Sequence, residues 1–487
     1  MTRRPHPVPD GGRRRRQGAA SPARHNVGAS ATGVVTPGTG AATTERDAAG
    51  LGARRVALDI LVRVDRGGAF ADVLLGHRLA AMPPRERRLV TRLVLGTLAW
   101  RGRLDYELTP LCTMPLEKLD PAVLGALRLG LFQMRHLSRI PAHAAVDTAV
   151  SLAGEAAGRG AAGFVNAVLR RTARFASPMP ERAADEAAYL AVACSHPRWM
   201  VELFIRRFGV ERAEAMMSAD NEAAPNTVRV NLARGTRGEI IARMKADGIE
   251  IASEGHLTET IILANAPDLN SESYRAGLFV PQSEASQLVA RMLAPAVGAD
   301  VVDCAAAPGG KATHLAELVG PRGRVVAFDF NLRGLIAARA LARRLGHINI
   351  DFARADIGAP PLRTGGARFV LLDAPCTGTG TLREHPEIRW RLKESDLSRM
   401  AGVQRRMLES VAALVAPGGV LVYAVCSLAP EEGLEVARDF LGRHPEFSIE
   451  RPPVPQLGPL LDSDGALVTS PERSGLAGFF AARMRRR

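Results

Sequence analysis

The sequence has few cysteines, no long apolar run and no apolar segment behind its N-terminal charges, and each absence narrows the class of protein. Its five cysteines are widely spaced and include no Cys-x-x-Cys pair, which argues against a disulfide scaffold or a cysteine-bound metal and indicates reduced thiols. No apolar run reaches the roughly 18 residues that a membrane span needs. Without a span or a visible secretory signal, the chain is expected to be cytoplasmic, with no membrane partner and no metal.

Basic residues outnumber acidic ones, 64 to 50, which gives a net charge of +14. Such an excess indicates a polyanionic partner such as a nucleic acid. At 487 residues, with 46% of them hydrophobic, the chain is long enough for several domains with buried cores. The composition therefore favours a multidomain protein that binds a polyanion.

The first part of the chain divides into a tail and a helical region. Residues 1–50 are rich in Pro, Gly, Ser, Thr and Ala, carry eight arginines against three acids, and are predicted to form a disordered basic tail. Residues 51–178 repeat apolar side chains at helical spacing, as in Val56, Ile60 and Val64, which predicts an all-α bundle. Its arginine clusters leave two interpretations open, a solvated helix surface or an RNA-binding one.

The rest of the chain divides into a small module and a larger domain. Residues 179–290 mix patterns, with a strand expected at 226–231 and a helix at 237–246, and predict a small α+β module. Residues 291–487 alternate apolar runs with helical segments. That rhythm predicts an α/β domain with a mostly parallel, Rossmann-like sheet covered by helices.

Acidic residues stand near the carboxyl ends of successive strands predicted in this last domain. They are Asp303, Asp329, Asp356 and Asp373. The carboxyl ends of parallel strands share one edge of a sheet, where an acid is positioned to bond ribose hydroxyls. Asp329 alone could equally cap the next helix, but four acids at one edge favour a nucleoside-bearing ligand.

A turn of small residues and two cysteines are expected at the same edge. The first strand is followed by Ala-Pro-Gly-Gly-Lys at 307–311, whose small residues allow backbone N–H groups to approach a ligand, although the spacing is not that of a phosphate or dinucleotide loop. Two later strands run into Cys376 and Cys426. A single buried cysteine is usually a packing residue, but two thiols that face one crevice indicate catalysis.

These elements resemble the RNA (cytosine-5)-methyltransferase family, which uses S-adenosylmethionine on a Rossmann-like sheet. The matching pieces are Ala-Pro308-Gly-Gly-Lys311, Asp373-Ala-Pro-Cys376-Thr-Gly-Thr-Gly380, His385-Pro-Glu-Ile-Arg-Trp390 and Cys426-Ser427. The sequence departs from the family at Ala305, where a cysteine is usual and Cys304 is displaced by one position. It departs again at Val425, where threonine is usual. Neither change removes a catalytic group.

The resemblance implies a role for each site residue. Cys426 is expected to be the nucleophile, and Cys376 to assist release of the enzyme from the methylated base. Asp373 is expected to contact either the base or the cofactor. Asp329 should hold the ribose of S-adenosylmethionine, and Asp356 should lie near its adenine. The residues expected to wrap its methionine end are Ala305, Ala306, Ala307, Pro308, Gly309, Gly310 and Lys311.

The other regions also resemble known domains. Residues 53–175 resemble the NusB antitermination factor domain, particularly at 140–146 and 163–170, and residues 225–231 and 280–284 are similar to the family's small RNA-recognition-like module. The three-part arrangement resembles the ribosomal RNA small subunit methyltransferase B type of the family. It implies an rRNA substrate, either free or in an assembly intermediate, and a monomeric enzyme.

Two alternatives stay open from the sequence. A cytosine-5 methyltransferase acting on tRNA would need the same site, and only the NusB resemblance favours rRNA over it. A non-catalytic RNA-binding assembly factor could keep the fold, but the two cysteines, the glycine turn and all four acids are present, which disfavours it. A DNA methyltransferase is disfavoured because resemblance to that family would put the nucleophile in the Pro-Cys element.

Overall fold

The computed structural model describes residues 40–79, 82–175 and 177–487. The predicted basic tail falls partly outside them, since residues 1–39 are not among the described residues. Residues 40–50 belong to helix α1 (Gly40–Gly67), so the prediction of disorder is wrong for this stretch. Alanine, glutamate and arginine favour helix, and extending an existing helix avoids the cost of nucleating a new one.

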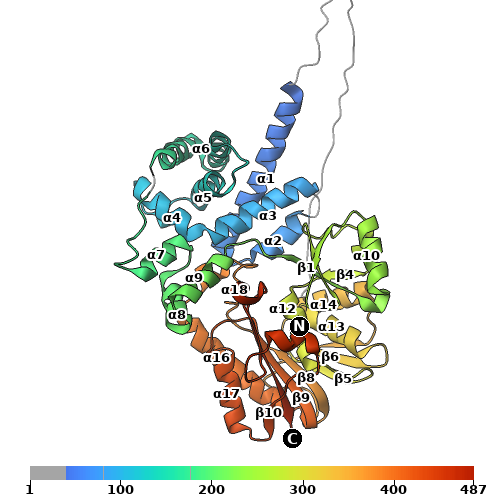
Figure 1. The fold of residues 1–487 in the computed structure, drawn as a ribbon. Coiled ribbons are helices and arrows are strands. Elements are labelled where there is room, and N and C mark those ends of the chain that lie inside the picture. Colours follow the sequence, from blue (N-terminus) through green and yellow to red (C-terminus); the bar gives the residue numbers. More distant parts are fainter. Residues whose placement is uncertain (1–39, 80–81, 176) are drawn as a thin grey trace, which may run out of the picture. The chain divides into compact units, whose positions relative to one another are not determined.

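The described residues of the helical region, 51–178, form helices and connecting loops, as predicted (Figure 1). Besides α1 these helices are α2 (Ala71–Leu79), α3 (Pro84–Ala99), α4 (Arg101–Leu108), α5 (Pro121–His136) and α6 (Ala142–Arg174). Their core buries the predicted apolar faces, including Ile60 and Val64 of α1 and Leu93 of α3. Within α6 the chain bends at Gly158, where φ is 84°, a value that glycine adopts without a steric cost.

The middle module, residues 179–290, begins with short helices and continues with an antiparallel sheet. The helices are α7 (Glu186–Ala193), α8 (Arg198–Phe208), α9 (Val210–Ala219), α10 (Arg237–Ala246) and α11 (Glu272–Arg275). The strands are β1 (Asn226–Val230), β2 (Ile251–Glu254), β3 (Thr260–Leu263) and β4 (Phe279–Pro281), in the order β2-β3-β1-β4. The strand and the helix predicted from the sequence are both confirmed.

The C-terminal domain, residues 291–487, is built on a mostly parallel sheet. Its strands are β5 (Asp300–Asp303), β6 (Arg324–Asp329), β7 (Ile350–Arg354), β8 (Ala367–Asp373), β9 (Val415–Val425), β10 (Phe447–Ile449), β11 (Leu467–Thr469) and β12 (Phe479–Arg486). The order is β10-β12-β9-β8-β5-β6-β7. Strands β5 to β9 pair in parallel, whereas β12 is antiparallel to β9, β10 and β11.

Helices cover both faces of this sheet, which is why its strands are apolar on both sides. The helices are α12 (Glu284–Leu293), α13 (Gly310–Val319), α14 (Leu332–Leu345), α15 (Ile388–Arg391), α16 (Glu394–Ala412), α17 (Leu434–Arg443) and α18 (Pro471–Ser474). Val301 of β5 packs in one core with α12 and α13, and Val302, whose side chain points to the opposite face, packs in another with α16 and α17. The predicted Rossmann-like architecture is confirmed.

In the part of the chain that the structure describes, none of the helices has both the length and the apolar character needed to cross a bilayer. The carboxyl ends of β5, β6, β8 and β9 lie along a single edge of the sheet, because these strands are parallel. The fold therefore gathers the residues predicted to be functional at that edge.

Candidate active site

The two cysteines singled out in the sequence lie side by side. Cys376 follows β8 and Cys426 follows β9, and these strands are parallel neighbours in which Asp373 is aligned with Ala424. The chain therefore leaves both strands at the same level. The two sulfur atoms are 2.9 Å apart and form a hydrogen bond, although the residues are 50 positions apart in the sequence. Both cysteines are free.

The surroundings of the two sulfur atoms differ in charge. The hydrogen bond to Cys426, burial and the negative charge of Glu432 hold the pKa of the Cys376 thiol well above its usual value. Lys311, in contrast, lies close enough to Cys426 to interact with charge on its sulfur atom. Because a nearby anion opposes formation of a thiolate, this arrangement keeps a proton on Cys376.

Lys311 links the glycine turn to the strand that precedes Cys376. Its Nζ atom is 2.6 Å from Oδ2 of Asp373, the last residue of β8. Burial alone would lower the pKa of Lys311, but the negative charges of Asp373, Cys426 and Asp303 outweigh it and raise the pKa above its usual value. The ammonium group also lies 5.4 Å from the ring centre of Phe479, a cation–π contact. Lys311 therefore stays charged at the centre of the site.

Asp303, the last residue of β5, is fully buried. Within the described part of the chain neither of its carboxyl oxygens has a well-formed hydrogen bond. Burial, reinforced by the negative charge of Asp373, raises its pKa to about 7. This carboxyl group is thus partly protonated near neutral pH, a property that its place at a strand end did not predict.

Asp329 holds the turn that follows β5. Its Oδ2 atom accepts a hydrogen bond of 2.9 Å from the backbone N–H of Ala307, and its Oδ1 atom accepts one of 2.7 Å from that of Asn331. A carboxylate has about four acceptor positions, so Asp329 keeps room for a further donor such as a ribose hydroxyl. In the same turn Gly309 has φ of 102°, and a Cβ atom there would lie 2.7 Å from Cβ of Ala338. Glycine is therefore required at this position.

A cavity of about 890 Å³ joins the predicted residues at the sheet edge. Its lining includes Cys376 and Cys426, together with the acids Asp329, Asp356 and Asp373. Asp356 is exposed and accepts a hydrogen bond from the N–H of Gly358. Of the turn residues, Ala305 and Ala307 line the cavity. Those outside its lining are Ala306, Pro308, Gly309, Gly310 and Lys311.

This cavity suits S-adenosylmethionine. Its volume lies within the range of about 300 to 1,000 Å³ that is typical of small-molecule sites. The carboxylates of Asp329, Asp356 and Asp373 offer acceptors for the hydroxyl, amino and ammonium groups of such a molecule. The cysteines line the same cavity, so a methyl donor held there would lie beside the thiols.

The middle module supports the glycine turn from behind, through a residue whose role the sequence did not reveal. Arg229 of β1 is fully buried and donates to the backbone oxygen of Gly310 at 2.8 Å. It also donates to Oγ1 of Thr313 and forms an ion pair with Glu317, each at 3.0 Å. The turn and helix α13 are thus fixed by a charge from another part of the chain.

The segment after Cys376 docks on the helical region. Trp390 donates its indole N–H to the backbone oxygen of Leu98 at 2.7 Å, and Arg391 donates to that of Val64 at 3.0 Å. Glu387, also in this segment, accepts a hydrogen bond of 2.8 Å from the backbone N–H of Ala71. The His-Pro-Glu-Ile-Arg-Trp segment therefore connects the loop of Cys376 to the helices of the region predicted to bind RNA.

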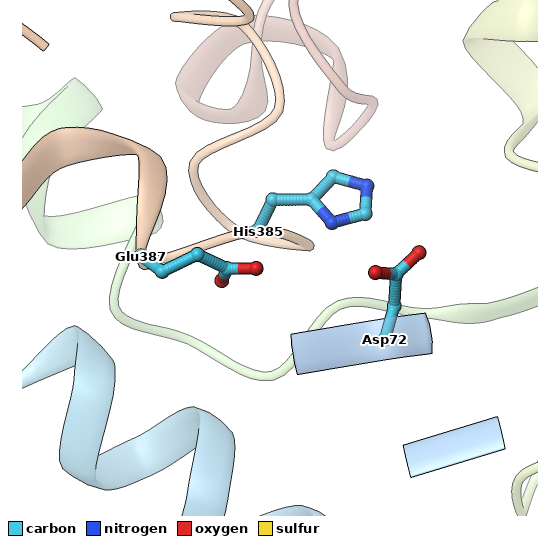
Figure 2. A group of neighbouring side chains, drawn as sticks. All are labelled: Asp72, His385 and Glu387. Carbon is cyan, nitrogen blue, oxygen red and sulfur yellow. The ribbon is translucent and has the colours of Figure 1, made fainter. Parts of the chain in front are cut away.

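One group of side chains at this contact has the composition of a metal site. Asp72, His385 and Glu387 point toward one another (Figure 2), and each offers a ligand atom within 4.8 Å of the others. One oxygen of Glu387 already accepts the N–H of Ala71, the first residue of α2, which is the role of a helix cap. Asp72 is exposed. The other oxygen of Glu387 and Nδ1 of His385 are buried without a hydrogen-bond partner among the described residues.

The sheet, the cavity at its carboxyl edge and the acids around it define a Rossmann-like methyltransferase with S-adenosylmethionine as its cofactor. Residues 290–485 match the family described as 16S rRNA methyltransferase RsmB/F. Residues 51–174 match the NusB family, and residues 196–270 match the ferredoxin-like domain of RsmF/B-like methyltransferases. The chain belongs to the RsmB/F family of 16S rRNA methyltransferases.

Individual relatives agree over most of the chain. It is 34% identical over 447 residues to the probable ribosomal RNA small subunit methyltransferase B of Bacillus subtilis, across 89% of this chain and 98% of the relative. It is 38% identical over 441 residues to the ribosomal RNA small subunit methyltransferase B of Thermus thermophilus, across 89% and 97%. The crystal structure of PH0851 matches with a TM-score of 0.77 at 26% identity, across 88% of this chain and 98% of that one.

Proposed function

We propose that this protein transfers a methyl group from S-adenosylmethionine to carbon 5 of a specific cytosine in 16S rRNA, through a covalent bond between Cys426 and carbon 6 of the base. The observation that carries the proposal is the pair of sulfur atoms, 2.9 Å apart, on the wall of the cavity. Methyl transfer to an oxygen or to an exocyclic nitrogen would need no thiol. Transfer to carbon 5 of a pyrimidine does.

The chemistry explains why a thiol is needed. Carbon 5 of cytosine is too weak a nucleophile to attack a methyl donor directly. When a thiolate adds to carbon 6, the ring becomes an enamine-like species whose carbon 5 is nucleophilic. S-adenosylmethionine supplies the methyl group as an electrophilic sulfonium. A base must then remove the proton from carbon 5, after which the bond between sulfur and carbon 6 breaks and the thiolate leaves.

The two thiols have different roles in this proposal. Cys426 is the nucleophile, and Lys311 supplies a cation that interacts with charge on its sulfur. Cys376 keeps its proton, because the hydrogen bond to Cys426, burial and the charge of Glu432 raise its pKa, and it assists release of the enzyme from the methylated base. Asp329 holds the ribose and Asp356 lies near the adenine of the cofactor. Asp373 contacts the cofactor or the base.

The glycine turn completes the proposed cofactor site. The turn residues assigned to the methionine end of the cofactor are Ala305, Ala306, Ala307, Pro308, Gly309, Gly310 and Lys311. The turn and the three acids of this site are each held by a hydrogen bond or an ion pair to another protein group. Such preorganisation reduces the entropy lost when the reacting groups are brought together.

The proposed substrate is rRNA, free or in an assembly intermediate. The relatives named as small-subunit rRNA methyltransferases and the net charge of +14 support this class of RNA. The target cytosine must be unstacked to reach a thiol, so a single-stranded or locally opened segment is expected. We also propose a cytoplasmic monomer divided at residues 50, 178 and 290.

Transfer of labelled methyl to unmethylated small-subunit rRNA tests the function. The wild type and Cys426→Ser are compared, and the product is mapped by bisulfite sequencing. A single protected cytosine that disappears in the variant is the expected result. Label on tRNA but not on rRNA would instead identify a tRNA methyltransferase. Failure to bind the cofactor at all would point to a non-catalytic RNA-binding factor.

A further inference from the structure

One buried carboxylate touches the residues that follow both cysteines. Glu432 has no exposed surface. It accepts a hydrogen bond of 2.8 Å from the backbone N–H of Thr377 and another from the hydroxyl of that residue. It also accepts one of 2.6 Å from the hydroxyl of Ser427 and one of 3.0 Å from the amide of Gln404 on α16.

These four contacts fix two separate loops to one another. Thr377 is the residue after Cys376, and Ser427 is the residue after Cys426. The residue that follows each cysteine is therefore hydrogen-bonded to the same carboxylate, that of Glu432. The hydroxyl of Ser427 additionally lies 2.9 Å from that of Thr379, which adds a direct link between the loops.

We propose that Glu432 is the positioning residue of the active site, and that it holds the thiols of Cys376 and Cys426 at the distance that the reaction requires. The inference rests on the proposed function, which explains why that distance matters. The four hydrogen bonds to Glu432, which we call the clamp, are a property of the folded chain. Glu432 forms no hydrogen bond with either thiol. It acts on them through Thr377 and Ser427.

A carboxylate suits this position better than any other side chain. Four donors converge on Glu432, and an ionised carboxylate is the side-chain group that only accepts and has about four acceptor sites. Replacing it with alanine would leave buried donors without a partner, which is unfavourable, and the loops would shift to satisfy them. Its charge has a second effect, because it opposes ionisation of the Cys376 thiol.

Three variants distinguish the effect of the four hydrogen bonds from the effect of the negative charge of Glu432. Glu432→Ala removes the hydrogen bonds and the charge together. Glu432→Gln removes the charge but can keep all four contacts, since the two hydroxyl groups can turn round and accept from the new amide. Glu431→Gln is the matched control, because it removes the same charge one residue earlier, where the side chain forms an ion pair with Arg207 instead.

The first measurement reads the distance between the sulfur atoms without RNA or cofactor. Diamide oxidises two neighbouring thiols to a disulfide and takes up both hydrogens, so the rate at which the Cys376–Cys426 bond appears, followed by peptide mass spectrometry, reports how well the thiols are held. We expect a marked slowing in Glu432→Ala and a rate close to that of the wild type in Glu431→Gln. This result does not depend on which nucleic acid is methylated.

The second measurement is methyl transfer. In Glu432→Ala we expect kcat to fall by about 100-fold, the cost of a misplacement of about 1 Å, with the KM for RNA and the affinity for cofactor nearly unchanged. Glu432→Gln should restore much of that loss. If Glu432→Ala does not fold, Thr377→Val combined with Ser427→Ala removes both hydroxyl donors and so weakens the clamp from its other side. Wild-type disulfide formation and wild-type kcat in folded Glu432→Ala, or in this double variant, would overturn the proposal.

Discussion

Cys376 and Cys426 share one hydrogen bond, with their sulfur atoms 2.9 Å apart. Such a bond needs a donor and an acceptor, so the two thiols cannot behave alike. The charge of Glu432 acts on Cys376, and that of Lys311 interacts with Cys426. In the proposed mechanism Cys376 is the donor of this hydrogen bond, and Cys426 is its acceptor and the nucleophile.

Substitution of each cysteine should therefore give a different defect. Cys426→Ser removes the nucleophile and should abolish methyl transfer without forming a covalent complex with RNA. Cys376→Ser keeps the nucleophile but impairs release, so a protein–RNA adduct should accumulate and appear as a slow band on a denaturing gel. The opposite pattern, with the adduct in Cys426→Ser, would reverse the two roles.

Lys311→Met should slow the reactions of Cys426 more than it weakens cofactor binding. The substitution removes the cation beside the sulfur and leaves the carboxylate of Asp373 without its partner at 2.6 Å. We expect alkylation of Cys426 by iodoacetamide at pH 7 to be slower, because a cation near a thiol favours the reactive thiolate. Lys393→Met, at the exposed beginning of α16, serves as a control that removes the same charge elsewhere. Equal alkylation rates in Lys311→Met and wild type would contradict the electrostatic role.

Stability should depend on pH through Asp303. Burial raises its folded-state pKa from 3.8 to about 7, so the folded state binds a proton more tightly than the unfolded state. As the pH rises from about 4 to about 7, the unfolded state loses its proton first and the free energy of unfolding falls, by at most about 4 kcal/mol for a difference of this size.

Asp303→Asn should remove this dependence, because an amide stays neutral at every pH. Urea unfolding at pH 5 and pH 8 would show a smaller difference between the two pH values in the variant than in the wild type. A difference of the same size in both proteins would show that Asp303 is not the group responsible.

The arginines of helix α3 should contribute to RNA binding unequally. Arg88 and Arg92 are exposed, line a cavity of about 700 Å³ and form no ion pair with any residue that the structure describes. They lie four positions apart, where like charges repel each other unless an anion is present. Arg87 on the same helix is already paired with Asp268 at 3.1 Å.

The effect of replacing each of these arginines with alanine can be measured from the salt dependence of RNA affinity. Losing Arg88 or Arg92 should weaken binding and reduce the slope of log affinity against log salt by about 0.7 for each phosphate contact with single-stranded RNA. Arg87→Ala should have a smaller effect. Unchanged slopes in the Arg88 and Arg92 variants would place the RNA elsewhere.

The sequence predicted the parts of the site that follow from the regularity of a parallel sheet. Asp373 ends one buried strand, and Cys376 and Cys426 follow the ends of two such strands, so their convergence could be inferred from strand order alone. The partner of Lys311 could not, because an ion pair depends on how a turn and a strand are placed in space. The same limit applies to Arg229, which reaches the glycine turn from a different module.

Glu432 shows most clearly why the rest could not be predicted. It stands beside Glu431 in the sequence, and nothing local distinguishes two adjacent acids. In the folded chain Glu431 forms an ion pair with Arg207, whereas Glu432 is buried and accepts hydrogen bonds from four donors. Its role is set by residues about 28 and 55 positions away, which no pattern of neighbouring residues encodes.

Residues 387–391 and the helical region contribute different kinds of group to the hydrogen bonds between them. Residues 387–391 contribute the side chains of Glu387, Trp390 and Arg391, whereas the helical region contributes main-chain N–H and C=O groups. Every amino acid supplies the same main chain, so these hydrogen bonds do not depend on which side chains the helices carry. Substitution is restricted instead at Gly102, where a Cβ atom would lie 2.7 Å from the Trp390 ring, and at Arg101 and Phe70, which form cation–π contacts with Trp390 and Arg391.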